Sequence, residues 1–379
     1  NQVPYRAPGE SLVQPAEVLV GTHALDSIIY EINTVENDLP TGPAYKANQY
    51  AAKMLLMKCY LNRAVYINRS NPHFENTDMD KVITLADEII ERDTFKLSKN
   101  YFDNFAPDNT AAGTENIFTI KNDRSVDPQN LMVLSWLMSL HYDQYAPGFG
   151  GVNGFTTLDS FYNKFESNDI RRGTAYKVNG SPVNPGNHVN VGFLVGQQYY
   201  LNNPSNPNDS IFTSDKNSVP LNYTSIVSNL ETGPGARLSG IRGIKYYPDF
   251  QDYGSPDNDF VFFRFSDVLL MKAEAIHRGG SATEAGGYGN NPVKILNSIR
   301  THSSRNASAL TAVDNNILLD ERGRELWWEG WRRQDMIRFG KFLKPVQERD
   351  YESDPKFLLY AIPAEQIAVN PNLKQNPGY

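Results

Sequence analysis

The chain has 379 residues, 40% of them apolar, which is enough for one large unit or two to three ordinary domains with a real core. Its formal charge is −7, from 36 basic and 43 acidic residues. This balance argues against a nucleic-acid partner, because neutralising phosphates requires a basic face. The single cysteine, Cys59, excludes a disulfide or a cysteine metal site within the chain. No apolar run of about 18 residues and no signal peptide is present. Because the first residue is not Met, we expect a processed or fragmentary product.

Amphipathic helices dominate the N-terminal quarter of the sequence. Residues 1–20 look extended, and apolar positions at helical spacing then predict a helix over residues 24–35. Two further helices are predicted, over about residues 43–67 and around residues 82–90. These two would form a hairpin of tetratricopeptide-like proportions. The Trp, Leu-Gly and Tyr pattern of the standard repeat is absent, so this prediction depends on geometry alone.

The middle of the chain, residues 98–260, has a different composition. Gly, Asn, Pro, Asp and Tyr dominate, and the best short helix candidates are residues 131–140 and 158–165. An irregular segment this long is usually functional or disordered, and it carries too many aromatic residues for disorder. We therefore predict folded loops and short strands mounted on a helical scaffold.

Helices resume in residues 261–379. Ser266 is the expected N-cap of the first, and Pro292 suits the first position of the second. Residues 318–340 are predicted to form one long helix or a kinked pair, with Asp314 as a candidate N-cap. A short turn of helix and an extended tail end the chain.

Residues 318–340 hold three of the four tryptophans, which predicts a structural hub. Gly323 and Gly330 fall on one stripe, and each costs about 1 kcal/mol of helix propensity relative to alanine. That cost predicts the close approach of another helix. Glutamates and arginines interleave at helical spacing, as in an exposed ladder whose salt bridges contribute a few tenths of a kcal/mol each. The charged residues are Glu321, Glu325, Glu329, Arg322, Arg324, Arg332 and Arg333.

Patterns that suggest catalysis have plainer interpretations. Glu321 and Glu325 lie one helical turn apart among arginines, which lower carboxyl pKa values and disfavour a general acid. The glycine-rich residues 148–154 lack the ending of a phosphate loop and the dinucleotide-binding spacing, so a turn-rich loop is expected. The six histidines are scattered, and no histidine metal site or cofactor is expected. The pattern does not exclude a structural calcium site formed by loop aspartates and backbone carbonyl oxygens.

Aromatic and polar side chains of the middle segment are the candidate ligand contacts. Exposed rings can stack on a polar ring-shaped ligand, and carboxamides can bond its hydroxyls. Trp136 lies among leucines and methionines, so burial in the core is an equally good interpretation for it. A further candidate group is Tyr199-Tyr200 with Asn202-Asn203. The predicted ligand-binding residues are Trp136, Tyr142, Tyr145, Phe149, Asn153, Tyr246 and Tyr247, with Phe250 and Tyr253 beside the last two.

Three segments carry a resemblance to a known family. Residues 263–275, FRFSDVLLMKAEA, are similar to the motif Arg-Tyr-Ala-Asp-Val-Leu-Leu-Met-x-Ala-Glu-Ala. Residues 321–338 are similar to Glu-Arg-x-x-Glu-Leu-x-x-Glu-Gly-x-Arg-x-x-Asp-Leu-x-Arg, and residues 362–379 resemble the family's ending. Residues 150–172 and 44–65 extend the match. The chain thus resembles the SusD/RagB nutrient-binding lipoproteins of Bacteroidetes outer membranes, without their lipoprotein signal, lipid-carrying cysteine and first helical segment.

The resemblance implies a mainly α fold of tetratricopeptide-like helical pairs with a loop-rich ligand face. Residues 1–97 and 261–379 would be the scaffold and residues 98–260 the ligand-face insert of one unit. It also implies a non-catalytic protein, held by a lipid anchor on the extracellular face of the outer membrane. Such a protein binds an oligosaccharide and delivers it to a SusC-type TonB-dependent transporter. The family motifs fix no ligand residue. The alternatives are peptide or glycopeptide cargo, a glycoside hydrolase, and a pure scaffold that binds only the transporter.

Overall fold

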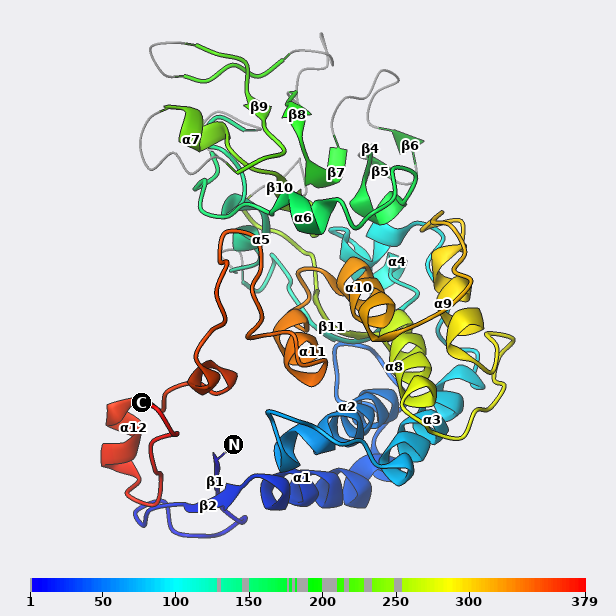
Figure 1. Ribbon diagram of the computed structural model, residues 1–379, viewed down its shortest axis with the longest axis vertical. Helices are drawn as coiled ribbons and strands as arrows, with labels where there is room; N and C mark the ends of the chain where they lie inside the picture. Colours follow the sequence, from blue (N-terminus) through cyan, green and yellow to red (C-terminus); the bar gives the residue numbers. More distant parts are fainter. Residues whose placement is uncertain are drawn as a thin grey trace.

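Figure 1 shows the computed structural model, in which helices from both ends of the sequence form a scaffold and the middle of the chain forms a loop-rich body at one end of it. The two chain termini lie close together, and the Gln2 Nε2 donates to the Lys374 carbonyl oxygen at 2.6 Å. The structure describes residues 2–127, 131–144, 150–175, 177–178, 181–182, 190–199, 210–214, 218–227, 234–248 and 254–379.

The N-terminal scaffold consists of three helices after a strand pair, β1 (Gln2–Tyr5) with β2 (Glu17–Val20). They are α1 (Thr22–Val35), followed by the 3-10 turn η1 (Glu36–Asp38), α2 (Gln49–Ile67) and α3 (Asn76–Ile90). The predicted pairing of the second and third helices is confirmed, since α2 and α3 pack on each other. The predicted start of α2 near residue 43 is wrong. Asn48 caps the helix by accepting a hydrogen bond from the Ala51 N–H at 2.9 Å, which fixes its first turn.

The C-terminal scaffold adds helices that cover α3. Helix α8 packs on α3 and α9 packs on α8. Asp314 is confirmed as an N-cap, because its Oδ1 accepts from the Ile317 N–H at 2.8 Å. Ser266 is not a cap but lies inside the helix, which Arg264 precedes. The elements are α8 (Phe265–His277), α9 (Pro292–Arg300), α10 (Asn315–Leu326), α11 (Arg332–Arg338), η5 (Pro355–Leu358) and α12 (Ala364–Val369).

The loop-rich body contains short helices and small antiparallel sheets. Strand β3 pairs with β11 and so joins the start of this body to the scaffold, while β7 lies between β10 and β4. The helices are η2 (Tyr101–Phe105), α4 (Asn109–Ala112), η3 (Leu131–Val133), α5 (Leu134–Leu137), α6 (Asp159–Tyr162), η4 (Ile170–Arg172) and α7 (Pro234–Leu238). The strands are β3 (Asn116–Ile120), β4 (Gly173–Ala175), β5 (Lys177–Val178), β6 (Ser181–Pro182), β7 (Asn190–Leu194), β8 (Gly196–Gln197), β9 (Asn222–Tyr223), β10 (Arg242–Ile244) and β11 (Phe260–Arg264).

The scaffold and the loop-rich body each have a main hydrophobic core of their own. The first lies between α2, α3, α8, α9 and α10 and contains residues such as Met54, Ile89 and Leu270. The second holds the loop-rich body together around Tyr101, Trp136 and other buried aromatic rings. The irregular segment is therefore folded, as predicted, because its aromatic residues supply the apolar area that regular elements would otherwise provide.

The predicted kinked pair over residues 318–340 is observed as α10 and α11, separated by a turn. Trp328 has φ 60° and Gly330 has φ 84°, so neither residue continues the helix. The expected close approach of another helix is wrong for Gly330, and at Gly323 it is made by a side chain of α11. A Cβ on Gly323 would lie 2.7 Å from Arg332 Nη1, a side chain of the following helix, and a Cβ on Gly330 would meet open space.

Gly330→Ala is expected to lower the free energy of unfolding by about 1 kcal/mol, because alanine is strained at positive φ while nothing is displaced. Gly330→Asn should cost less, since asparagine tolerates this conformation better. Urea unfolding of the wild-type protein and the two variants measures the order of their stabilities. An alanine variant as stable as the asparagine variant would contradict it.

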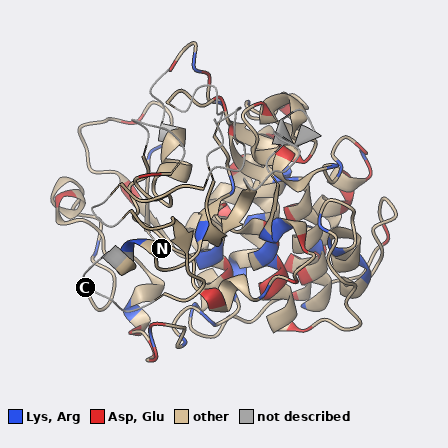
Figure 2. Cartoon of the chain, turned by 90° about the horizontal axis from the view of Figure 1, so that it is seen from above, with Lys and Arg blue, Asp and Glu red and all other residues tan. Residues whose placement is uncertain are grey.

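The charged ladder of α10 is buried, which corrects the expectation of an exposed surface. Glu321 and Glu325 are both 0% exposed. Glu325 accepts from Arg171 Nη1 at 3.0 Å, Arg264 Nη1 at 2.7 Å and Arg305 Nη2 at 2.6 Å. These arginines come from η4, β11 and the chain after α9, so the ladder faces other segments and not water. Figure 2 shows acidic and basic residues intermingled in the scaffold helices.

A second buried network ties the scaffold helices to one another. Arg322 binds Asp267 at 3.0 Å and Asp335 at 2.9 Å, which links α10 to α8 and α11. Arg338 of α11 binds Glu274 of α8 at 2.7 Å. The Glu325 network thus joins the scaffold to the loop-rich body through Arg171, and this second network joins α8, α10 and α11 within the scaffold.

Candidate ligand-binding site

Three predicted ligand residues belong to the second hydrophobic core. Trp136 is 0% exposed, Tyr246 is 2% exposed and Tyr247 is 8% exposed. The Tyr246 hydroxyl accepts from the Val261 N–H at 2.9 Å, and its ring packs on Phe105 and Phe260. Trp136 and Tyr246 therefore present no ring face to a ligand, and we correct their expected exposure. The leucines and methionines around Trp136 were the sequence signal for this outcome.

Tyr142 and Asn153 lie in one group with the exposed Arg237 and the buried Arg242. The Tyr142 side chain is 50% exposed, and the Arg237 guanidinium lies 5.8 Å from its ring centroid. Arg242 Nη2 donates to Asn153 Oδ1 at 2.8 Å and to the Arg237 carbonyl oxygen at 2.9 Å. We call these four residues the Tyr142 face. The sequence did not indicate the arginines, because they approach Tyr142 only through the fold.

Close backbone packing brings Asn153 toward Tyr142. The Gly151 N–H donates to the His141 carbonyl oxygen at 3.0 Å, and the Gly154 N–H donates to the Met138 carbonyl oxygen at 2.8 Å. A Cβ on Gly150 or Gly151 would overlap the carbonyl groups of residues 142 and 140. The described glycines of residues 150–154 therefore serve a close-packed loop and not a phosphate loop.

Other predicted contacts lie outside the described residues and stay predictions. They are Tyr145, Phe149, Tyr200, Asn202, Asn203, Phe250 and Tyr253. Tyr199 is described, and it is half-buried against the second core.

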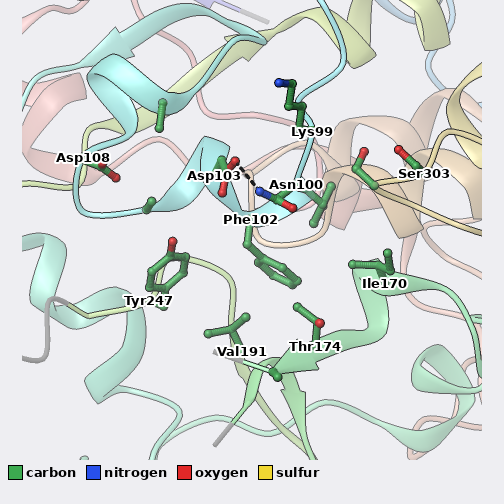
Figure 3. A pocket seen from close by; sticks show the side chains of 15 residues that line it. Lys99, Asn100, Phe102, Asp103, Asp108, Ile170, Thr174, Val191, Tyr247 and Ser303 are labelled. Atoms are coloured by element: carbon green, nitrogen blue, oxygen red, sulfur yellow. Dashed lines mark hydrogen bonds between the residues drawn. The ribbon is translucent and has the colours of Figure 1, made fainter. Parts of the chain in front are cut away.

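A separate cavity of about 260 Å³ opens where the loop-rich body meets the scaffold. In Figure 3 the Phe102 ring points into it, and polar side chains surround this ring. Asn100 Nδ2 donates to Asp103 Oδ2 at 3.0 Å on one wall. Thr174, Tyr247 and Ser303 line other parts of the cavity, so Tyr247 is the predicted residue that borders it. Sequence reasoning assigned no role to residues 99–108, because their polar side chains follow no recognisable motif.

The glutamates of α10 are not suited to proton transfer. Burial alone would raise the pKa of Glu321, but the guanidiniums of Arg171, Arg324 and Arg300 outweigh it and lower the pKa to about 2. Glu321 is therefore a carboxylate at neutral pH, and it is enclosed by its partners. This geometry supports the salt-bridge interpretation of the Glu321–Glu325 pair over a glycosidase pair, which needs a cleft for the sugar.

Within the described ranges, no three His, Cys, Asp or Glu side chains are placed together so that they could hold a metal ion. No helix in the described part of the chain is both long enough and apolar enough to span a bilayer.

The fold is a tetratricopeptide-like helical scaffold that carries a loop-rich body with its own aromatic core. The family model described as the SusD family matches residues 136–379, which is more than half of the chain. The chain belongs to the SusD family, which confirms the resemblance of the motifs and the predicted fold.

Curated relatives include the starch-binding protein SusD of Bacteroides thetaiotaomicron, which is 26% identical over 393 residues. That match covers 95% of this chain and 66% of SusD. SusD-like protein P38 of Formosa agariphila is 27% identical over 157 residues, covering 38% of this chain and 30% of P38. The chain thus spans about two thirds of SusD's length and less of P38.

Solved structures share the fold at lower sequence identity. A SusD superfamily protein from Parabacteroides distasonis has a TM-score of 0.67 at 18% identity, covering 100% of this chain and 74% of that one. Surface glycan-binding protein A of Bacteroides thetaiotaomicron, solved in complex with laminarihexaose, has a TM-score of 0.63 at 19% identity. That match covers 95% of this chain and 72% of the other.

Proposed function

We propose that this protein binds an oligosaccharide without catalysis on the extracellular face of the outer membrane and delivers it to a SusC-type TonB-dependent transporter. A lipid anchor would hold it there. Membership of the SusD family supports this role, as do the starch-binding relative SusD and the structural neighbour solved in complex with laminarihexaose. The Tyr142 face is the observation that carries the proposal to particular residues.

The Tyr142 face offers both kinds of contact that a sugar needs. The half-exposed ring of Tyr142 provides an apolar face for stacking. Arg242 can only donate hydrogen bonds, so Asn153 must turn its Oδ1 toward the guanidinium. The Asn153 Nδ2 forms no hydrogen bond within the described part of the chain, and it remains free to donate to a hydroxyl.

Tyr142→Ala is expected to weaken binding of the retained glycan by about tenfold, because the stacking face is lost. Affinity gels containing starch, laminarin, levan, xylan, mannan or mucin glycans identify the ligand, and titration calorimetry measures the dissociation constant. Tyr142→Phe keeps the ring and should bind nearly normally. Tyr30→Ala is the matched control, because Tyr30 is an exposed tyrosine on α1 of the scaffold.

Unchanged glycan binding by Tyr142→Ala would reject the Tyr142 face as the site. If the protein is retained only in a gel that carries a mucin-derived peptide, its ligand is a peptide or glycopeptide and not a glycan. Turnover of a chromogenic glycoside would contradict the non-catalytic role.

A further inference from the structure

A second cavity lies away from the Tyr142 face and has no residue in common with it. It has a volume of about 510 Å³ and is bounded by the last turn of α2, by α11 and by residues 358–363 of the C-terminal segment. Arg69 and Arg333 both line it, together with Tyr66, Gln334 and Tyr360. We call it the Arg69 cavity. Its size is within the range of pockets that bind small molecules.

The two arginines of the Arg69 cavity differ from the buried arginines of the protein. Arg171, Arg264 and Arg305 each form ion pairs with at least two carboxylates. Within the described residues, neither Arg69 nor Arg333 forms an ion pair with a carboxylate; their contacts are with rings and one carbonyl group. The formal charge of the protein is −7, yet no carboxylate of the described chain neutralises these two half-buried guanidiniums.

Arg333 is held in place before any ligand arrives. Its guanidinium lies 4.2 Å from the Tyr360 ring centroid and 4.8 Å from that of Phe342, and Nη2 donates to the Phe357 carbonyl oxygen at 2.7 Å. The other N–H groups of the Arg333 guanidinium form no hydrogen bond in the described chain. A planar fork fixed in this way suits the two oxygens of a carboxylate.

Arg69 supplies a second positive charge to the same cavity. Its guanidinium lies 5.7 Å from the Tyr66 ring centroid. Burial lowers the pKa of Arg69, and the positive charge of Arg333 lowers this pKa further. The two cations therefore repel each other across the cavity, and a bound anion would relieve that repulsion.

We propose that the Arg69 cavity binds a carboxylate-bearing sugar residue, such as a uronic acid, at a site separate from the Tyr142 face. The carboxylate would meet Arg333 and Arg69. Tyr66, Tyr360 and Gln334 line the space for the sugar ring. The Gln334 carboxamide forms no hydrogen bond in the described chain and would bind the hydroxyls of the sugar. The choice of a sugar over an acidic peptide rests on the proposed function; the preference for a carboxylate does not.

Titration calorimetry with a glucuronate-containing oligosaccharide and its neutral counterpart tests this site. We expect binding of the acidic sugar alone at this site, and affinity that falls as salt is raised. Arg69→Gln and Arg333→Gln should each weaken it by about tenfold or more, because a charge-assisted contact is lost. The matched control is Arg92→Gln, because Arg92 is an exposed arginine beyond α3 whose side chain forms no hydrogen bond or ion pair in the described chain.

Thermal melting checks that the variants fold. Arg333 also packs on Tyr360, so if Arg333→Gln is unstable, Arg69→Gln carries the test, because its side chain forms no hydrogen bond in the described chain. Equal affinity for neutral and acidic sugars at this site, or an unchanged Arg69→Gln variant, would overturn the inference. An acidic hexapeptide that binds in an Arg69-dependent way while the uronate does not would overturn the sugar assignment.

Failure of this site and failure of the proposed function give different results. Neutral glycan binding that depends on Tyr142, without uronate binding, rejects only the Arg69 cavity. Uronate binding that depends on Arg69 and not on Tyr142, without any neutral glycan binding, supports the Arg69 cavity and rejects the Tyr142 face.

Discussion

Glu325→Gln is expected to lower the free energy of unfolding by about 3–5 kcal/mol, because it leaves buried cations without their shared partner. Glu325 receives Arg171, Arg264 and Arg305, and all four side chains are essentially inaccessible to water. Glutamine has nearly the same size, so packing changes little. It carries no charge, however, and it cannot accept from three guanidiniums as a carboxylate does.

Urea unfolding followed by circular dichroism measures this loss. Glu352→Gln is the matched control, because Glu352 pairs with Lys344 at the surface, where both side chains are more than half exposed. An exposed pair of this kind contributes about 1 kcal/mol or less. If the two variants lose similar stability, the buried network is not the main electrostatic support of the fold.

Acid is expected to remove stability between about pH 4.5 and pH 2, again through α10. The pKa of Glu321 is lowered from 4.5 to about 2 in the folded protein, where arginine charges outweigh the effect of burial. Between these values the unfolded chain binds the proton and the folded chain does not, so the free energy of unfolding falls as the pH falls. The contribution is complete above pH 4.5 and amounts to roughly 3 kcal/mol for this one group. The pKa values of Glu274 and Glu325 are lowered as well, so they add in the same direction.

Comparison with Glu321→Gln isolates that contribution. The stability difference between the wild-type protein and Glu321→Gln should shrink by roughly 3 kcal/mol from about pH 6 to about pH 2. Urea titrations over this range measure the difference, and Glu352→Gln should show no comparable change. A difference that stays constant with pH would mean that Glu321 titrates alike in the folded and unfolded chains.

Much of the scaffold could be predicted because its signals are local. Apolar spacing located α1 and α3, and Asp314 and Pro292 marked helix starts that the structure confirms. The charged residues of α10 could not be placed in the same way. Their spacing is that of a surface ladder, and only the arrival of Arg171 and Arg305 from distant segments turns that surface into an interior.

The candidate site was less predictable than the scaffold for a related reason. Tyr142 and Trp136 are both aromatic residues of one irregular segment, yet one is half-exposed and the other is enclosed. Apolar neighbours in sequence gave a hint for Trp136. Nothing local indicates that Arg237 lies against Tyr142, or that Arg69 and Arg333 share a cavity, since each pair is joined only by tertiary packing.

The buried joint between the scaffold and the loop-rich body separates two kinds of information in this sequence. Arg171, Arg264 and Glu325 belong to the segments that resemble the family, and their side chains are fully engaged with one another. Such residues can identify the ancestry of a chain, but they cannot discriminate between cargoes, because no ligand reaches them. The sequences of the exposed loops can therefore change while the buried joint stays the same. Two relatives with matching motifs can then bind different ligands.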